Sequence, residues 1–160
     1  MSVNDFTEAI KPYFSHIPKK SSSGVSALKG IASYLDLIFS EPSSLLVFAS
    51  SGMFSTEGKL IAIGEGRVAA LSFGFNPDDG DSFSISGVVE AASSVRQLEI
   101  EPASTAFASR DDVEVRPVVK ILFDGFGEIT IGRGQDVEFS AERENTSDGV
   151  RLRALIDALK

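Results

Sequence analysis

The sequence predicts an α+β fold: a bent antiparallel β-sheet or partly open barrel, capped by a C-terminal helix and preceded by one or two N-terminal helices. Two observations support this prediction. In the second half of the chain, apolar residues recur at every second position over several short runs, which is the period of strands with one covered face. Apolar residues at helical spacing occur only near the two ends, and strands without helices between them do not favour a parallel sheet.

Two helical segments are predicted before the strands. Phe6 and Ile10 begin a stripe at helical spacing, but Pro12 removes a backbone donor and should break or kink this helix. A longer helix is predicted from about Val25 to Ser40, because Pro42 marks a stop. Its apolar stripe consists of Leu28, Ile31, Leu35 and Ile38.

The composition between these helices divides the chain. Pro18 to Gly24 holds two lysines and three consecutive serines, which is typical of a surface linker. We therefore predict a helical appendage in residues 1–40 and a β domain, with its C-terminal helix, in residues 41–160.

The middle of the chain is expected to form strands joined by turns. The predicted strands are Leu45–Phe48, Lys59–Ile63, Arg67–Phe75, Ser82–Ser86 and a run through Val95, Leu98 and Ile100. The turn-forming residues of Asn76–Asp81 should reverse the chain. The small and polar residues from Pro102 to Asp112 are predicted to form a long loop or an exposed hairpin tip.

From Pro117 onward the alternation is clearest. The apolar positions are Val119, Ile121 and Phe123, then Ile129 and Ile131, then Val137, Phe139 and Ala141. Polar residues such as Glu128, Thr130 and Glu138 separate the later of these positions, so one face of these strands should be buried and the other should meet water.

A capping cluster from Asn145 to Gly149 precedes the predicted C-terminal helix. The helix has an apolar stripe, Leu152, Leu155, Ile156 and Leu159, that should close the sheet. Leu155 and Ile156 are expected to be buried. The basic residues Arg151, Arg153 and Lys160 are expected on or near the exposed side.

The order of elements from about Tyr34 to Lys160 resembles the bacterial pleckstrin-homology-like (PH-like) domains. Gly58–Val68 is similar to the second-strand hairpin of that family, Phe123–Ile131 to its late glycine-containing hairpin, and Leu152–Ile156 to its closing helix. The resemblance implies a PH-like barrel closed by the final helix.

Charge and composition restrict the partners. The formal charge is −8, and residues 1–40 hold four basic and three acidic side chains, which leaves eleven basic and twenty acidic ones for the β-rich part. Such a surface repels phosphate backbones and anionic headgroups, so nucleic-acid binding is not expected. The absence of cysteine rules out disulfides and thiolate chemistry, and nothing indicates a secretory signal or membrane span, so a cytoplasmic location is expected.

Lipid binding is doubtful for a second reason. Eukaryotic members of the PH-like family are associated with phosphoinositide binding through basic residues near the first hairpin, but Ser50–Gly58 has no basic residue before Lys59. The same stretch holds Met53 and Phe54 between small polar residues. These two are candidate interaction residues at a hairpin tip, and folding back onto the core is the alternative.

No catalytic, cofactor-binding or metal-binding residue is assigned. Gly64–Ala69 has the form G-x-G-x-x-A, but no helix follows it, so glycines in a hairpin turn are the better interpretation. Asp78, Asp79 and Asp81 fit a solvated turn better than a calcium loop. His16 is the only histidine, which excludes a catalytic triad or a multi-histidine metal site.

The leading hypothesis is a non-enzymatic module for protein interaction or self-assembly, which recognises protein, including a second copy, through a sheet edge or exposed loop. The alternative is a small-molecule-binding protein or a carboxylate-based enzyme with a pocket inside the curved sheet. The twelve phenylalanines could line such a cavity, although they more often fill a core.

Overall fold

The computed structural model describes residues 3–11, 22–50, 57–75, 83–107, 113–132, 137–141 and 148–159. The helices are α1 (Val3–Ile10), α2 (Ser22–Ile38) and α3 (Asp148–Ala158), with single 3-10 turns η2 (Pro42–Ser44) and η3 (Ala92–Ser94). The strands are β1 (Leu46–Ala49), β2 (Glu57–Gly64), β3 (Arg67–Phe75), β4 (Phe83–Ala91), β5 (Val95–Phe107), β6 (Val113–Phe123), β7 (Gly127–Gly132) and β8 (Phe139–Ser140).

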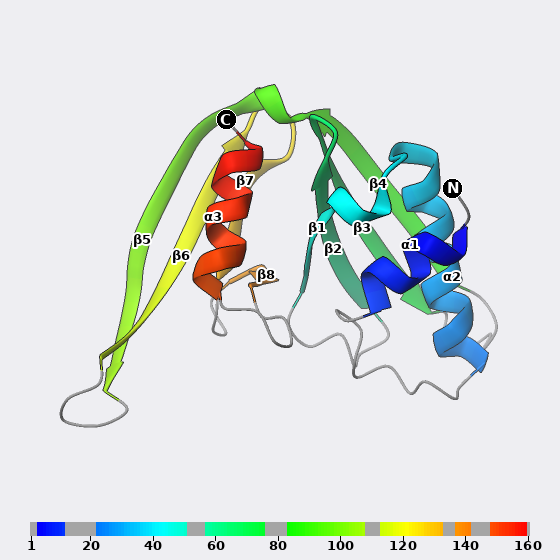
Figure 1. The fold of residues 1–160 in the computed structure, drawn as a ribbon, viewed down its shortest axis with the longest axis horizontal. Helices are drawn as coiled ribbons and strands as arrows, with labels where there is room; N and C mark the ends of the chain where they lie inside the picture. The colour runs from blue at the N-terminus through cyan, green and yellow to red at the C-terminus, as the bar shows by residue number, and fades with distance from the viewer. Residues whose placement is uncertain are drawn as a thin grey trace.

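These strands form one curled sheet in the order β4-β3-β2-β1-β8-β7-β6-β5. Neighbouring strands are antiparallel except β7 and β8, which pair in parallel through Ile131 with Phe139 and Gly132 with Ser140. Figure 1 shows the sheet as an arch, with α3 between its two wings and α1 and α2 outside one wing. The predicted α+β fold with a partly open barrel and a C-terminal helix is confirmed, with one parallel contact that the alternation pattern could not reveal.

The strand β2 is buried on both faces, and two cores therefore meet at it. Ile61 and Ile63 belong to the core that faces α3, whereas Leu60 and Ala62 belong to the core under α1 and α2. Successive side chains of a strand point to opposite faces, so a continuous apolar run is what a doubly covered strand requires.

The N-terminal helices cover the outer face of β2 and β3. Phe6 and Ile10 of α1 and Ile31 and Leu35 of α2 are fully buried there. The helix α2 begins at Ser22, a little earlier than predicted. Pro12 and most of the predicted linker lie outside the described residues, and the division at residue 40 stays a prediction.

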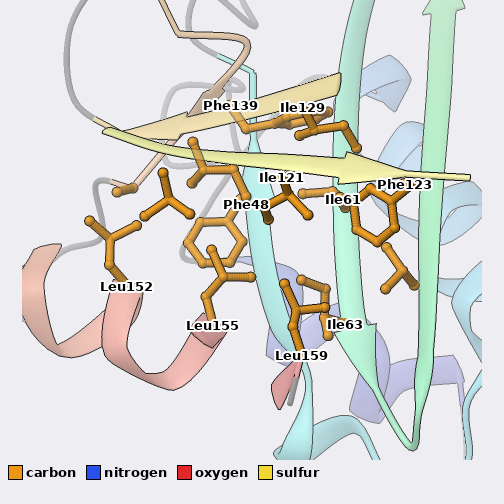
Figure 2. Close-up of a cluster of buried hydrophobic side chains, with 14 of the residues drawn as sticks. Phe48, Ile61, Ile63, Ile121, Phe123, Ile129, Phe139, Leu152, Leu155 and Leu159 are labelled. Carbon is orange, nitrogen blue, oxygen red and sulfur yellow. The ribbon is translucent and has the colours of Figure 1, made fainter. Parts of the chain in front are cut away.

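The helix α3 closes the concave face of the sheet. Figure 2 shows Leu152, Leu155 and Leu159 directed toward Phe48 and Ile63 and the strands beyond them. Leu155 is completely buried, as predicted, while Ile156 is only half-buried.

The prediction for Arg151 was wrong, because this side chain is only 3% exposed. Its guanidinium donates hydrogen bonds to the carbonyls of Ala141, at 2.6 Å, and Val47. The strands β1 and β8 share a single residue pair, Ala49 with Ser140, so the sheet ladder between them is short. The Arg151 guanidinium supplies hydrogen-bond donors beside the short ladder between β1 and β8. Helical periodicity alone could not predict that this side chain is buried. Arg153 is exposed, as expected, and Lys160 lies outside the described residues.

The predicted loop from Pro102 begins later than expected. The strand β5 continues to Phe107 and pairs with β6 through Phe107 and Val113, so the exposed-hairpin alternative is the better description of this segment. Figure 1 shows this hairpin extending beyond the other strands. The hairpin between β2 and β3 is tight, with Glu65 at φ 51° and Gly66 at φ 72°, as a two-residue primed turn requires.

Within the described residues, no helix has both the length and the apolar character that a membrane crossing demands.

Candidate functional site

Among the described residues, β4 and β5 are the two terminal strands of the curled sheet, so their outer backbone groups are candidates for pairing with a partner. In the sheet order each of them has one neighbour, β3 for β4 and β6 for β5. A terminal strand carries backbone N–H and C=O groups that can pair with another chain. The two strands differ sharply in how well they are protected against such pairing.

The edge of β5 carries several features that discourage pairing. Its register with β6 shifts twice, between Val95 and Gln97 and again between Pro102 and Ser104. Pro102 lacks a backbone N–H, and Glu99 is a charged, exposed residue on the same strand. Irregular backbone, proline and charge are the usual means by which natural sheets block edge-to-edge association.

The edge of β4 carries none of these features from Phe83 to Val89. Its nine residues pair with β3 without a register shift, from Phe83 opposite Phe75 to Ala91 opposite Arg67. Phe83–Val89 contains no charged residue and no proline. Two successive apolar side chains are nevertheless exposed, Val88 at 57% and Val89 at 45%. A long, regular and apolar edge strand is the type that accepts an additional strand.

The two faces of β4 differ in their cover. Gly87 lies opposite Leu71, and a side chain at this position would collide with Leu71 and come within 3.1 Å of Tyr34 of α2. The face that carries Gly87 and Val89 is therefore the one next to α2. Val88 lies on the concave face with Glu90. The helix reaches the strand at Tyr34 but leaves Val89 nearly half exposed.

Glu90, the charged residue near the C-terminal end of β4, holds this end of the strand in place. The carboxylate of Glu90 accepts hydrogen bonds from the backbone N–H groups of Gly125, at 2.8 Å, and Phe126, at 2.9 Å. These two residues form the turn between β6 and β7, so the contact joins the two wings of the arch. The N–H of Asp124 donates to the carbonyl of Ser94 at 3.1 Å, and Asp124 forms an ion pair with Arg96.

A second set of contacts fixes α2 against the hairpin of β2 and β3. The carboxylate of Glu65 accepts hydrogen bonds from the hydroxyl of Ser40 at 2.5 Å and its N–H at 2.8 Å, and these bonds lower the pKa of Glu65. Arg67 donates to the carbonyl of Ile38, the last residue of α2, at 2.6 Å. Because a helix leaves its final carbonyls without intrahelical partners, this guanidinium serves as a C-terminal cap.

The concave interior of the arch is filled mainly by apolar side chains. Phe48, Phe123 and Phe139 are buried there against the leucines of α3, so these phenylalanines serve as core residues. Arg151 is the buried charged residue of this region, and its guanidinium lies 4.3 Å from the centre of the Phe48 ring. This cation–π contact adds to the two carbonyl contacts of the guanidinium.

The sequence-predicted interaction residues, Met53 and Phe54, lie outside the described residues, as do Asp78, Asp79 and Asp81. In the part of the chain that the structure describes, no three Asp, Glu or His side chains come together in a way that could hold a metal ion. Gly64 ends β2 and Gly66 lies in the turn between β2 and β3, as the interpretation of the G-x-G-x-x-A pattern as a hairpin turn predicted.

Sequence reasoning missed the edge of β4. A signal was present, because Phe83–Val89 carries no charge in a chain with a formal charge of −8. The strand order decided the matter, since only the sheet topology shows that β4 is terminal whereas β1, equally apolar, lies in the middle.

Comparison of the chain with protein-family models, with curated proteins and with solved structures finds no match in any of the three.

Proposed function

We propose that this chain is a non-enzymatic protein-interaction module and that the edge of β4 is its contact surface. The observation that carries the proposal is the exposure of Val88 on a terminal strand that has no charge, proline or register shift from Phe83 to Val89. An added strand would satisfy the outer backbone groups of β4 and cover this valine.

The contact surface is held at one end and contacted in its middle, which favours binding without large rearrangement. Glu90 holds one end of β4 to the turn between β6 and β7. Tyr34 lies over the middle of the strand at Gly87. A strand that is already in its bound conformation loses little conformational freedom on association.

The alternative of an enzyme or small-molecule binder has less support. The leucines of α3 and the phenylalanines of the sheet occupy the concave face on which a pocket was expected. The PH-like resemblance fits the arch and its closing helix, and it remains part of the proposal. A chain without cysteine suits the cytoplasm, where we propose that the module acts.

Site-specific photocrosslinking tests the proposal. A benzophenone amino acid is placed at position 88 in the full chain, and an extract of cells that produce this protein is irradiated. The matched control places the same group at Ile100, which is also 57% exposed but lies on the protected strand β5. Protein adducts are expected when the benzophenone group is at position 88 and not when it is at position 100. Equal labelling at both positions, or none at position 88, would contradict the proposal.

A further inference from the structure

The charge distribution along the edge of β4 bears on which protein it pairs with. The chain as a whole carries −8, and two copies therefore repel each other over most of their surfaces. The exposed edge from Ser84 to Val89 carries no such repulsion, because its six residues are all uncharged. Two copies can meet at this edge without placing like charges opposite each other, which would be destabilising.

The sequence of β4 is also self-complementary about Gly87. If two β4 strands pair antiparallel with Gly87 opposite Gly87 of a second copy, Ile85 of each strand lies opposite Val89 of the other. Ile85 and Val89 are both on the face next to α2, where Ile85 is half-buried and Val89 is 45% exposed. Apolar cross-strand pairs of this kind stabilise a sheet. On the concave face, the same register covers Val88 with Ser86.

Glycine at the centre suits this arrangement. Gly87 has no side chain, and Tyr34 of α2 lies close to it. In an antiparallel edge pairing, the two-fold axis is perpendicular to the joined sheet, so both α2 helices lie on the same face. The two Tyr34 side chains would then face each other over the paired glycines.

We infer that the partner of the β4 edge is a second copy of this chain, paired antiparallel about Gly87 into a continuous sheet across a two-fold axis. This inference rests on the proposed function and names the partner of the same edge. The contact between two short strand segments is smaller than a standard interface of about 1,600 Å². Association is therefore weak and depends on protein concentration. Because the surrounding charges repel, added salt strengthens it by screening them.

Sedimentation velocity of the purified full chain over a range of concentrations tests the inference. The expected result is a shift from the 17.0 kDa monomer toward twice that mass as concentration rises, with a larger dimer fraction at higher salt. Val88→Lys, which places a charge on the edge, should abolish the shift. Ile100→Lys, at equal exposure on β5, should leave it unchanged. A particle that stays monomeric at every concentration and salt level would overturn the inference, as would loss of association in the Ile100 variant alone.

The register has a separate test, because the natural chain contains no cysteine. Ser86→Cys and Val88→Cys are prepared as two single variants, mixed and oxidised. The proposed register brings position 86 of one copy opposite position 88 of the other, so mixed disulfide dimers are expected. In a dimer of either variant alone, the two cysteines are farther apart than the ~7 Å Cα separation that a disulfide tolerates. Equal crosslinking in all three samples, or none in the mixture, would overturn the register.

The outcomes separate the two proposals. A strictly monomeric chain that still forms photoadducts at position 88 with other proteins would overturn self-pairing and leave the interaction edge in place. A chain that forms no adduct at position 88, with itself or with others, would overturn both.

Discussion

The guanidinium of Arg151 lies over the ring of Phe48, 4.3 Å from its centre, and donates hydrogen bonds to the carbonyls of Val47 and Ala141. One side chain of α3 thereby connects β1, the end of β8 and the concave core. A buried charge of this kind is tolerated only when its donors are used, and here the strands supply the acceptors.

Replacing Arg151 with Met should therefore destabilise the protein although it removes a buried charge. The substitution keeps most of the volume but leaves two carbonyls without this donor, at a cost of about 1–3 kcal/mol in the free energy of unfolding. Urea denaturation measures the change. Arg153→Met on the exposed side of the same helix is the control, and equal midpoints for the two variants would contradict the assigned role.

Leu155→Ala should be among the most destabilising changes in α3. The side chain is completely buried against the sheet, and its truncation should cost about 2–5 kcal/mol. Ile156→Ala should cost clearly less, because Ile156 is only half-buried. Thermal melts of the two variants test this order. If the Ile156 variant melts at a lower temperature than the Leu155 variant, Ile156 and not Leu155 faces the core.

Glu65→Gln should reduce stability in a pH-dependent way. The hydrogen bonds from Ser40 lower the pKa of Glu65 in the folded protein. A group whose folded pKa is lowered contributes stability above its unfolded pKa and loses it as pH falls through the folded pKa. The difference in midpoint between the natural chain and the variant should be constant near neutral pH and shrink in the acid range below the usual glutamate pKa. A difference that grows on acidification would contradict the assignment.

Glu90→Ala should loosen the contact between the two wings of the arch. Its carboxylate accepts from two backbone N–H groups, and loss of charged hydrogen bonds of this type costs about 1–3 kcal/mol. Hydrogen exchange at Gly125 and Phe126 should accelerate selectively. Glu128→Ala, at an exposed position of β7, should not have this effect. Unchanged exchange at Gly125 and Phe126 would show that Glu90 does not hold the turn.

The sequence was most informative where one face of a strand is buried. Val119 and Ile121 of β6 lie on either side of Lys120, Ile131 of β7 follows Thr130, and all three apolar side chains are buried as predicted. The stripe of α3 was recognisable for the same reason. These patterns depend on local burial, which repeats with the period of the element.

Features that depend on two distant segments could not be predicted. The burial of Arg151 follows from carbonyls of Val47 and Ala141, which only the meeting of β1 and β8 brings together. The terminal position of β4 likewise follows from strand order and not from its own residues. The candidate site belongs to this second class, which explains why Met53 and Phe54 were selected from the sequence and Val88 was not.

Residue-resolved hydrogen exchange of the full chain, measured at low and high protein concentration, is the decisive test of self-pairing through β4. If the edge of β4 binds a second copy, amides within Ser84–Val89 should gain protection as concentration rises, while those of Leu98 and Ile100 on β5 should not change. Protection that rises on β5, or on neither strand, would contradict self-pairing through β4.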